Sequence, residues 1–419
     1  MKHDISQERQ FIYFPSFSVG NFSNAMKQDK KMREGLPFRF YAPDFPEEFR
    51  HKYFLVTAGH FYKKEDFINE WGFNDYGPDH MKLMGDSGGY QIASGAIKWD
   101  KSIRPKILNW LENNSHVAMN LDIPPRLKYD GKFNECLEIS KDNFKFFADN
   151  RKGKTEFLNV LQGDDELAYR KWYEEVKGFD FDGWGIGGCG GSIYRFMSGI
   201  CALMQGKEQY NDNRKWLHIL GTSKIIDFLI LSQLQKSLND VGSKMQVTTD
   251  SSSPSLAVVY GKFYHSMNLK KASFGPIHIP KERAEKNRSY TKHTDNTISG
   301  KPFFMPETCH FDKQLRGQYT YEDLRDWTIE GYGAAVLHNF MFFKDSMEKI
   351  NTYVYSSPYV LEQVISSDNF LLLRAIDEMV KAYDNATTPE KVFARYKHLF
   401  LKMSTTGKAS SIVEHDFYM

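Results

Sequence analysis

The chain has 419 residues, of which 41% are hydrophobic and 26% are charged, and its formal net charge is +2. This length allows one large α/β domain or two smaller ones, and the charge excludes a polycation. The sequence holds no run of about 20 apolar residues that would cross a membrane. Its opening, MKHDISQERQF, lacks the apolar core of a signal peptide.

The four cysteines are scattered along the chain, and none of them forms a CxxC pair. They are Cys136, Cys189, Cys201 and Cys309. This usage is typical of free thiols in a reducing compartment. We therefore expect a cytosolic globular protein.

Short apolar segments recur along the chain, and each ends in small or polar residues followed by helix-like sequence. They occupy residues 52–61, 82–90, 116–125, 156–165, 183–191, 215–223 and 245–253. Apolar residues at three- and four-residue spacing predict helices between them, for example at residues 167–176 and 225–238. Seven or eight such units over roughly 270 residues favour a (β/α)8 TIM barrel over an open doubly wound sheet.

The character of the sequence changes after Lys301, where a short irregular piece precedes helix-like sequence from Tyr321 to about Met403. We therefore expect a barrel at residues 1–300, a separate segment at 301–340, and C-terminal helices packed on the barrel at 341–419. No internal repeat or low-complexity tract is visible in the sequence.

A basic stretch occupies residues 262–301, although the whole chain is nearly neutral. Its central cations suit contact with a phosphate backbone, and a solvated loop or helix face explains them equally well. The candidate nucleic-acid-binding residues are Lys281, Arg283, Lys286 and Arg288.

Polar residues follow several of the predicted strands directly. Asp86, Asp122, Gln162 and Asp250 stand at four strand ends, and the pair Gly187–Gly188 stands at another. The carboxyl ends of barrel strands meet at one face, so we expect these residues to share a site. One aspartate alone could be a helix cap, and for Asp86 that interpretation remains open.

The residue types indicate a chemistry. Two carboxylates on opposite sides of a glycosidic carbon can perform a retaining substitution, one as nucleophile and the other as proton shuttle. A further aspartate and a glutamine beside glycine backbone suit the hydrogen-bonding edge of a heterocycle. This combination indicates a nucleobase rather than a sugar chain.

The segment GDSGGYQIASG, residues 85–95, resembles the signature of tRNA-guanine transglycosylases, which exchange guanine for a 7-deazaguanine on a (β/α)8 barrel. NLDIPP, VLQGDD, GIGGCGG, LHILGTS and VTTDSSSP resemble further family segments and follow in the same order. The resemblance implies that Asp86 is the general acid/base and Asp250 the nucleophile. Asp227 and Asp240 are fallback nucleophile candidates in helix-like sequence, because the spacing from Gly221 to Asp250 is longer than in the family.

The same resemblance implies a set of substrate-binding residues. Asp122 and Gln162 would read the base edge, Tyr90 would stack on the ring, and backbone or neighbouring groups would complete the site. The full set is Ser87, Gly88, Tyr90, Asp122, Gln162, Gly187, Gly188, Cys189, Leu220 and Gly221. Cys189 departs from the leucine that the family usually has.

The segment GAAVLHNFMFF resembles the part of the family that contains the zinc-binding histidine, here His338. The family's upstream C-x-C-x-x-C is replaced by Glu307, Cys309 and Asp312, with His310 as an alternative ligand. Zinc prefers sulfur and nitrogen donors, so residues 301–340 resemble a degenerate zinc subdomain. The implied chemistry needs no cofactor. The resemblance suggests zinc as a metal that this segment could bind. Packing alone could also maintain this segment.

The compact spacing between motifs and the eroded zinc segment look most like the 7-deazaguanine DNA transglycosylases of bacteriophages and bacterial DNA-modification clusters. This implies insertion of a base such as 7-cyano-7-deazaguanine (preQ0) into DNA, which protects DNA from restriction. The partners would be DNA and the base, with a homodimer left open and no membrane. The alternative is a tRNA enzyme of queuosine or archaeosine synthesis.

Two further classes remain as hypotheses. A non-catalytic nucleic-acid-binding subunit would lack the nucleophile, whereas this sequence has both Asp86 and Asp250. A barrel hydrolase acting on nucleosides or sugars would not need the base-reading Gln162.

Overall fold

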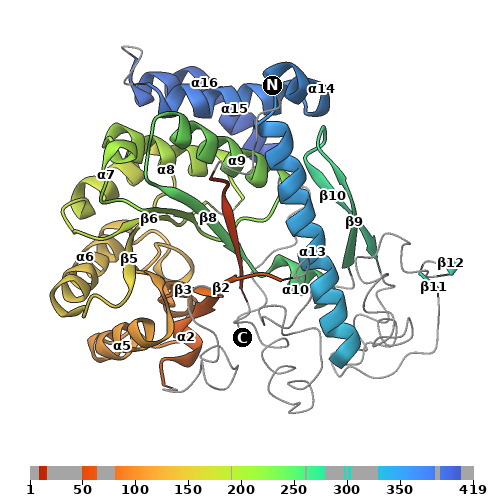
Figure 1. Cartoon of the computed structure of the whole chain (residues 1–419). Helices are drawn as coiled ribbons and strands as arrows, with labels where there is room; N and C mark the ends of the chain where they lie inside the picture. The colour runs from red at the N-terminus through yellow and green to blue at the C-terminus, as the bar shows by residue number, and fades with distance from the viewer. Residues whose placement is uncertain are drawn as a thin grey trace.

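The computed structural model describes residues 9–16, 50–63, 81–189, 191–259, 262–278, 297–298, 301–302, 329–382 and 387–406. Eight parallel strands form one sheet in the order β1-β8-β7-β6-β5-β4-β3-β2 (Figure 1). An isolated parallel bridge between Ser16 and Leu55 joins the two outer strands, so the sheet is a nearly closed barrel. The predicted (β/α)8 fold is confirmed.

Each barrel strand is short, and helices occur in the described segments between the strands. The strands are β1 (Ile12–Pro15), β2 (Tyr53–Thr57), β3 (Lys82–Asp86), β4 (Val117–Met119), β5 (Glu156–Leu161), β6 (Gly183–Ile186), β7 (Trp216–Ile219) and β8 (Gln246–Ser251). The helices between and after them are α2 (Ala58–Phe61), α4 (Gly89–Ser94), α5 (Arg104–Asn114), α6 (Phe133–Asn150), α7 (Glu166–Val176), α8 (Ile193–Gln205), α9 (Ile225–Asp240) and α10 (Ser253–Val259).

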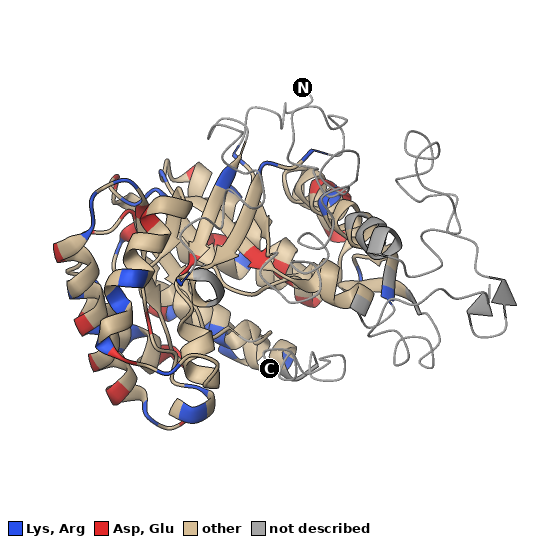
Figure 2. Cartoon of the chain, turned by 90° about the horizontal axis from the view of Figure 1, so that it is seen from below, with Lys and Arg blue, Asp and Glu red and all other residues tan. Residues whose placement is uncertain are grey.

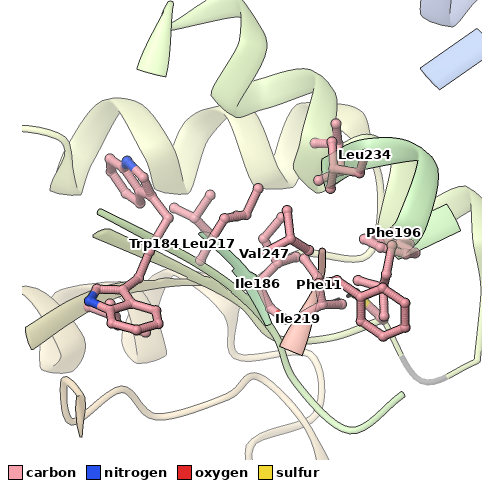
Figure 3. Close-up of a cluster of buried hydrophobic side chains, with 14 of the residues drawn as sticks. Phe11, Trp184, Ile186, Phe196, Leu217, Ile219, Leu234 and Val247 are labelled. Atoms are coloured by element: carbon pink, nitrogen blue, oxygen red, sulfur yellow. Dashed lines mark hydrogen bonds between the residues drawn. The ribbon is translucent and has the colours of Figure 1, made fainter. Parts of the chain in front are cut away.

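Side-chain alternation along β6, β7 and β8 separates the core from the barrel interior. One set of strand side chains, namely Trp184, Ile186, Leu217, Ile219 and Val247, lies in a buried cluster with Phe196 of α8, Leu234 of α9 and Phe11 (Figure 3). The other set faces the interior, because residues in register on neighbouring strands share a face. Gly185, His218 and Thr248 are in register across β6, β7 and β8 and belong to this inward set.

In the described part of the chain, the helices after the barrel are α13 (Ile329–Val354), α14 (Pro358–Val364), α15 (Ser367–Val380) and α16 (Pro389–Thr406). α13 and α15 pack against α9, α16 packs against α8, and α14 lies against α13 and α15 (Figure 1). Asp377 of α15 accepts a hydrogen bond from Ser237 of α9 at 2.7 Å, for example. α13 runs unbroken through residues 340 and 341, where the sequence-based division places a boundary. The rest of that division stays a prediction.

A hairpin of β9 (Lys262–Asn268) and β10 (Ser273–His278) follows α10 and lies beside α13 (Figure 1). Lys270 and Lys271 are exposed at its turn. Two further short strands pair with each other, β11 (Thr297–Ile298) and β12 (Lys301–Pro302). The candidate DNA contacts Lys281, Arg283, Lys286 and Arg288 lie outside the described residues.

Cations and anions are interspersed on the helices around the barrel (Figure 2). Ion pairs join neighbouring helices, such as Arg104 with Asp142 at 2.9 Å and Lys141 with Glu175 at 2.6 Å. Within the described ranges, no helix combines the length and apolar character needed to span a membrane. Cys136, Cys189 and Cys201 are buried and free, and Cys309 lies outside those ranges.

Candidate active site

The turn after β3 positions the first carboxylate. Asp86 is the last residue of β3 and is in register with Thr57, whose side chain hydrogen-bonds to it. Its Oδ1 accepts the N–H of Gly88 at 3.2 Å. Gly88 itself is the N-cap of α4, with a φ of 92° that favours glycine, and no side chain caps this helix. Asp86 therefore stabilises the turn without occupying the cap position.

The second glycine of the turn allows two loops to touch. A Cβ on Gly89 would collide with the backbone carbonyl of Asp122, so only glycine fits there. Ser87 is buried and donates its hydroxyl to the carbonyl of Asn120 at 3.1 Å. Both contacts hold the ends of β3 and β4 together. Tyr90 lies half-buried on α4.

Asp122 and Gln162 form a buried pair at the ends of β4 and β5. They are 5% and 4% exposed, and Gln162 Nε2 donates to Asp122 Oδ2 at 2.7 Å. Among the described residues, Gln162 Oε1 has no hydrogen-bond partner although it is buried. A buried acceptor without a partner is costly, and a bound molecule with N–H groups would satisfy it.

The glycine segment after β6 lies against this pair. A Cβ on Gly187 would collide with the side chain of Gln162. Both backbone groups of Gly187 are engaged, the N–H by Leu161 at 2.9 Å and the carbonyl by the Tyr169 hydroxyl at 2.5 Å. In the described part of the chain, no hydrogen bond uses the N–H groups of Gly188 and Cys189. Those two groups are the better candidates for contact with a base.

Cys189 was assigned to the site from its backbone, and its thiol has a different environment. The side chain is 2% exposed, and burial raises the pKa of the thiol to about 12. A thiol of this kind stays protonated near neutral pH and is a poor nucleophile.

Asp250 lies on β8, and its carboxylate is held from β7. Its Oδ1 accepts the N–H of Gly221 at 2.8 Å and lies 3.2 Å from Nε2 of His218. Leu220, beside Gly221, is only partly buried and packs on the core. The Asp250 side chain is 16% exposed, so it is open to a ligand.

His218 is the residue that sequence reasoning missed. It is fully buried, and its Nδ1 lies 2.8 Å from the hydroxyl of Thr248. It stands on β7 two residues before Leu220, which directly follows the strand, and its register with Gly185 and Thr248 makes it face inward. That spacing was a signal in the sequence for an inward histidine at this site.

The fallback nucleophiles have other roles. Asp227 accepts the N–H groups of Ser223 and Lys224 at 3.2 and 3.0 Å at the start of α9. Asp240 forms an ion pair with Lys381 at 2.7 Å at the end of that helix. Neither carboxylate stands at the end of a barrel strand.

The carboxylates at this end of the barrel influence one another. The pKa of Asp122 is raised to about 7, chiefly by burial, with a smaller contribution from the charge of Asp86. The pKa of Asp86 is raised to about 6, again chiefly by burial and also by the charge of Asp250. Among the described residues, no Lys or Arg forms an ion pair with Asp86 or Asp122. Such groups can exchange protons near neutral pH.

The proposed zinc ligands can be tested at one residue. His338 is buried on α13, and its Nε2 lies 2.8 Å from the carbonyl oxygen of Tyr264. A carbonyl only accepts, so that nitrogen carries a proton, and Nδ1 is the nitrogen that a metal would use; the zinc assignment stays a prediction. The described ranges hold no cluster of three or more His, Cys, Asp or Glu suited to a metal. Cys309, Glu307, His310 and Asp312 lie outside these ranges.

Comparison with known proteins adds no family to this picture. No protein-family model matches the chain, and no curated protein matches it. The function must therefore be argued from the chemistry of the barrel end, namely three inward carboxylates, one amide and a glycine backbone.

Proposed function

We propose that the chain is a transglycosylase that exchanges guanine in DNA for a 7-deazaguanine through a covalent intermediate on Asp250. The observation that carries the proposal is the convergence of Asp86, Asp122 and Asp250 at one end of the barrel, with Gln162 bound to Asp122. The resemblance of the strand-end motifs to tRNA-guanine transglycosylases supports the same assignment.

The first half-reaction uses two of the carboxylates. An oxygen of Asp250 attacks C1′ of the target nucleotide, and the electron pair of the C1′–N9 bond leaves with guanine. Asp86 gives the departing guanine a proton. Its raised pKa, about 6, keeps the protonated form accessible near neutral pH.

The second half-reaction reverses the roles. N9 of the incoming base attacks C1′, its proton passes to Asp86, and the bond to Asp250 breaks with the electron pair returning to the carboxylate. Both bases occupy the same place in turn. Atoms and charge balance over the two steps, so no metal or redox cofactor is required.

Asp122 and Gln162 would select the base. Guanine and 7-deazaguanines carry a ring N–H and an exocyclic amine on one edge, and these donors match the carboxylate of Asp122 and the unpartnered Oε1 of Gln162. The N–H groups of Gly188 and Cys189 suit the carbonyl oxygen of the same base. Adenine presents the opposite pattern on this edge and would leave acceptors facing acceptors.

The choice between DNA and tRNA does not depend on the reacting groups. The chemistry at C1′ is the same for DNA and tRNA, and only contacts near the 2′ position distinguish them. The target base must leave its stack, which costs a few kcal/mol in a duplex and less in a single strand. We therefore expect faster exchange in unpaired or flexible DNA.

The test is incubation of the purified chain with radiolabelled guanine and, in parallel, duplex DNA, single-stranded DNA or tRNA. We expect label in DNA and none with the Asp86→Asn variant. Label in tRNA alone would replace the polymer and keep the chemistry. No label in any polymer, with a folded protein, would refute the proposal.

A further inference from the structure

His218 is placed as a support for Asp250, because the ring is buried between polar groups of β7 and β8. The side chain has no exposed surface, yet both ring nitrogens have polar neighbours. Nδ1 lies 2.8 Å from Thr248 Oγ1, and Nε2 lies 3.2 Å from Asp250 Oδ1. All three side chains project inward from adjacent strands, β7 and β8.

The partner on each side fixes the direction of the hydrogen bonds. An ionised carboxylate only accepts, so Nε2 must carry a proton when Asp250 is charged. Thr248 can satisfy Nδ1 because its hydroxyl rotates to suit the ring. The ring therefore acts as a fixed donor toward Asp250, held from behind by Thr248.

The two oxygens of Asp250 are not equivalent. Oδ1 accepts from both Gly221 N–H and His218. For Oδ2, no hydrogen-bond partner exists among the described residues. Two donors on one oxygen fix the carboxylate plane, and they leave the other oxygen available for bond formation.

We propose that His218 is a positioning residue that holds Oδ1 of Asp250 so that Oδ2 is the atom that attacks C1′. This inference rests on the proposed function. During attack, a lone pair of Oδ2 forms the bond to C1′, and the electron pair of the C1′–N9 bond leaves with the base. In the return step the C1′–Oδ2 bond breaks, and the negative charge that returns to the carboxylate is met by donors already in place.

The experiment compares two variants that carry the same amide group at different reach. The amide nitrogen of Gln can reach the position of Nε2, whereas Asn reaches only that of Nδ1. We expect His218→Gln to retain the rate of covalent adduct formation within about tenfold, and His218→Asn to lose on the order of 10²-fold, as for loss of one donor to a reacting group. Adducts are measured by single-turnover denaturing gels with labelled DNA.

The readout must separate positioning from folding. We expect the Kd for DNA and the KM for the base to change less than threefold in both variants, with the loss confined to kcat. If His218 only fills space, His218→Asn would instead lower thermal stability and leave the adduct rate per folded molecule unchanged. That result would overturn the inference.

Thr248→Val removes the contact to His218 Nδ1 and leaves the histidine ring in place. Alone, it should slow adduct formation several-fold. Combined with His218→Gln, it should have no further effect, because that variant has no Nδ1 to be held. Equal losses in both backgrounds would contradict the inference. Absence of any adduct with the wild-type chain would refute the proposed function itself. A normal adduct rate in His218→Asn would overturn only the role of His218.

Discussion

Carboxyl groups at the two ends of the barrel have pKa values shifted in opposite directions. At the amino ends of the strands, Glu156 accepts hydrogen bonds from Lys215 and from Trp216 Nε1. Burial alone would raise the pKa of Glu156, but these contacts outweigh it and the pKa is lowered. Nearby, Glu208 and Arg214 form an ion pair at 3.1 Å with both side chains only 6% exposed.

At the carboxyl ends Asp122 is as deeply buried as Glu208, and more deeply than Glu156, but no Lys or Arg of the described chain forms an ion pair with it. Asp122 has only an amide as its side-chain partner, and its pKa is raised to about 7. The contrast shows that burial does not by itself decide the charge state of a carboxyl group. Pairing with a cation contributes as well, so a buried carboxyl group without one loses stability when it ionises.

The largest expected effect is at the carboxyl end. Asp250→Asn removes the proposed nucleophile and should reduce base exchange by at least about 10³-fold, because an amide oxygen cannot form a stable glycosyl ester. The measurement is label incorporation together with adduct trapping, and DNA binding by fluorescence anisotropy should stay within threefold.

Asp240→Asn is the matched control, because Asp240 is a surface carboxylate paired with Lys381. It should leave exchange within twofold of the wild type. Exchange that persisted in Asp250→Asn would place the nucleophile on another residue.

The next effect is expected at the amino end and concerns stability rather than activity. Arg214→Met would leave Glu208 buried without its cation and should lower the free energy of unfolding by about 3–5 kcal/mol. Denaturant titration followed by circular dichroism measures it. Exchange by the folded variant at low temperature should match the wild type.

The double variant Arg214→Met with Glu208→Gln should recover part of that loss, because no charge is then left unpaired. A loss below about 1 kcal/mol in the single variant would mean that this buried pair is not worth more than a surface pair.

The smallest effect has opposite signs at the two ends. The folded pKa of Asp122, about 7, lies above its unfolded value near 3.8, so ionisation of Asp122 costs stability as pH rises between these values. Asp122→Asn should therefore stabilise the fold at pH 8 by up to a few kcal/mol, and the gain should vanish near pH 4. The same variant should raise the KM for the base.

Glu156→Gln provides the opposite case. The folded pKa of Glu156 is lowered, so its ionised form contributes stability above the unfolded pKa, and the Gln variant should be less stable at pH 8. Unfolding of both variants at pH 4 and pH 8 checks the signs. A less stable Asp122→Asn at pH 8 would break the comparison.

The barrel could be predicted from the sequence because seven strand segments alternate with clear helical spacing. β1 was missed, since a run of four residues, Ile12–Pro15, does not differ locally from any other apolar run. The predicted segment 52–61 contains β2. Its last four residues form α2, Ala58–Phe61, because the carboxyl ends of barrel strands pass directly into loops and helices.

The aspartates of the site could be found because each follows its own strand. His218 could not be assigned a partner, since its contact with Asp250 depends on the register of β7 against β8, and register is set by the whole barrel. The raised pKa of Asp122 could not be predicted from the sequence either, because it comes from burial by distant segments. The roles of both residues in exchange remain proposals.

The path of α13 has a consequence for the order in which the chain can fold. In the first half of this helix, the Asn339 side chain donates to the backbone of Pro254 and Lys262, and just past the helix end the Tyr355 hydroxyl donates to the carbonyl of Arg9. Phe343, between them, stacks on Phe274 with ring centroids 4.7 Å apart. During synthesis, β1 can therefore complete its contacts only after β8 and a helix more than three hundred residues downstream have been made. A nascent chain stopped before α13 would leave this aromatic surface uncovered, an opening for chaperones or for aggregation.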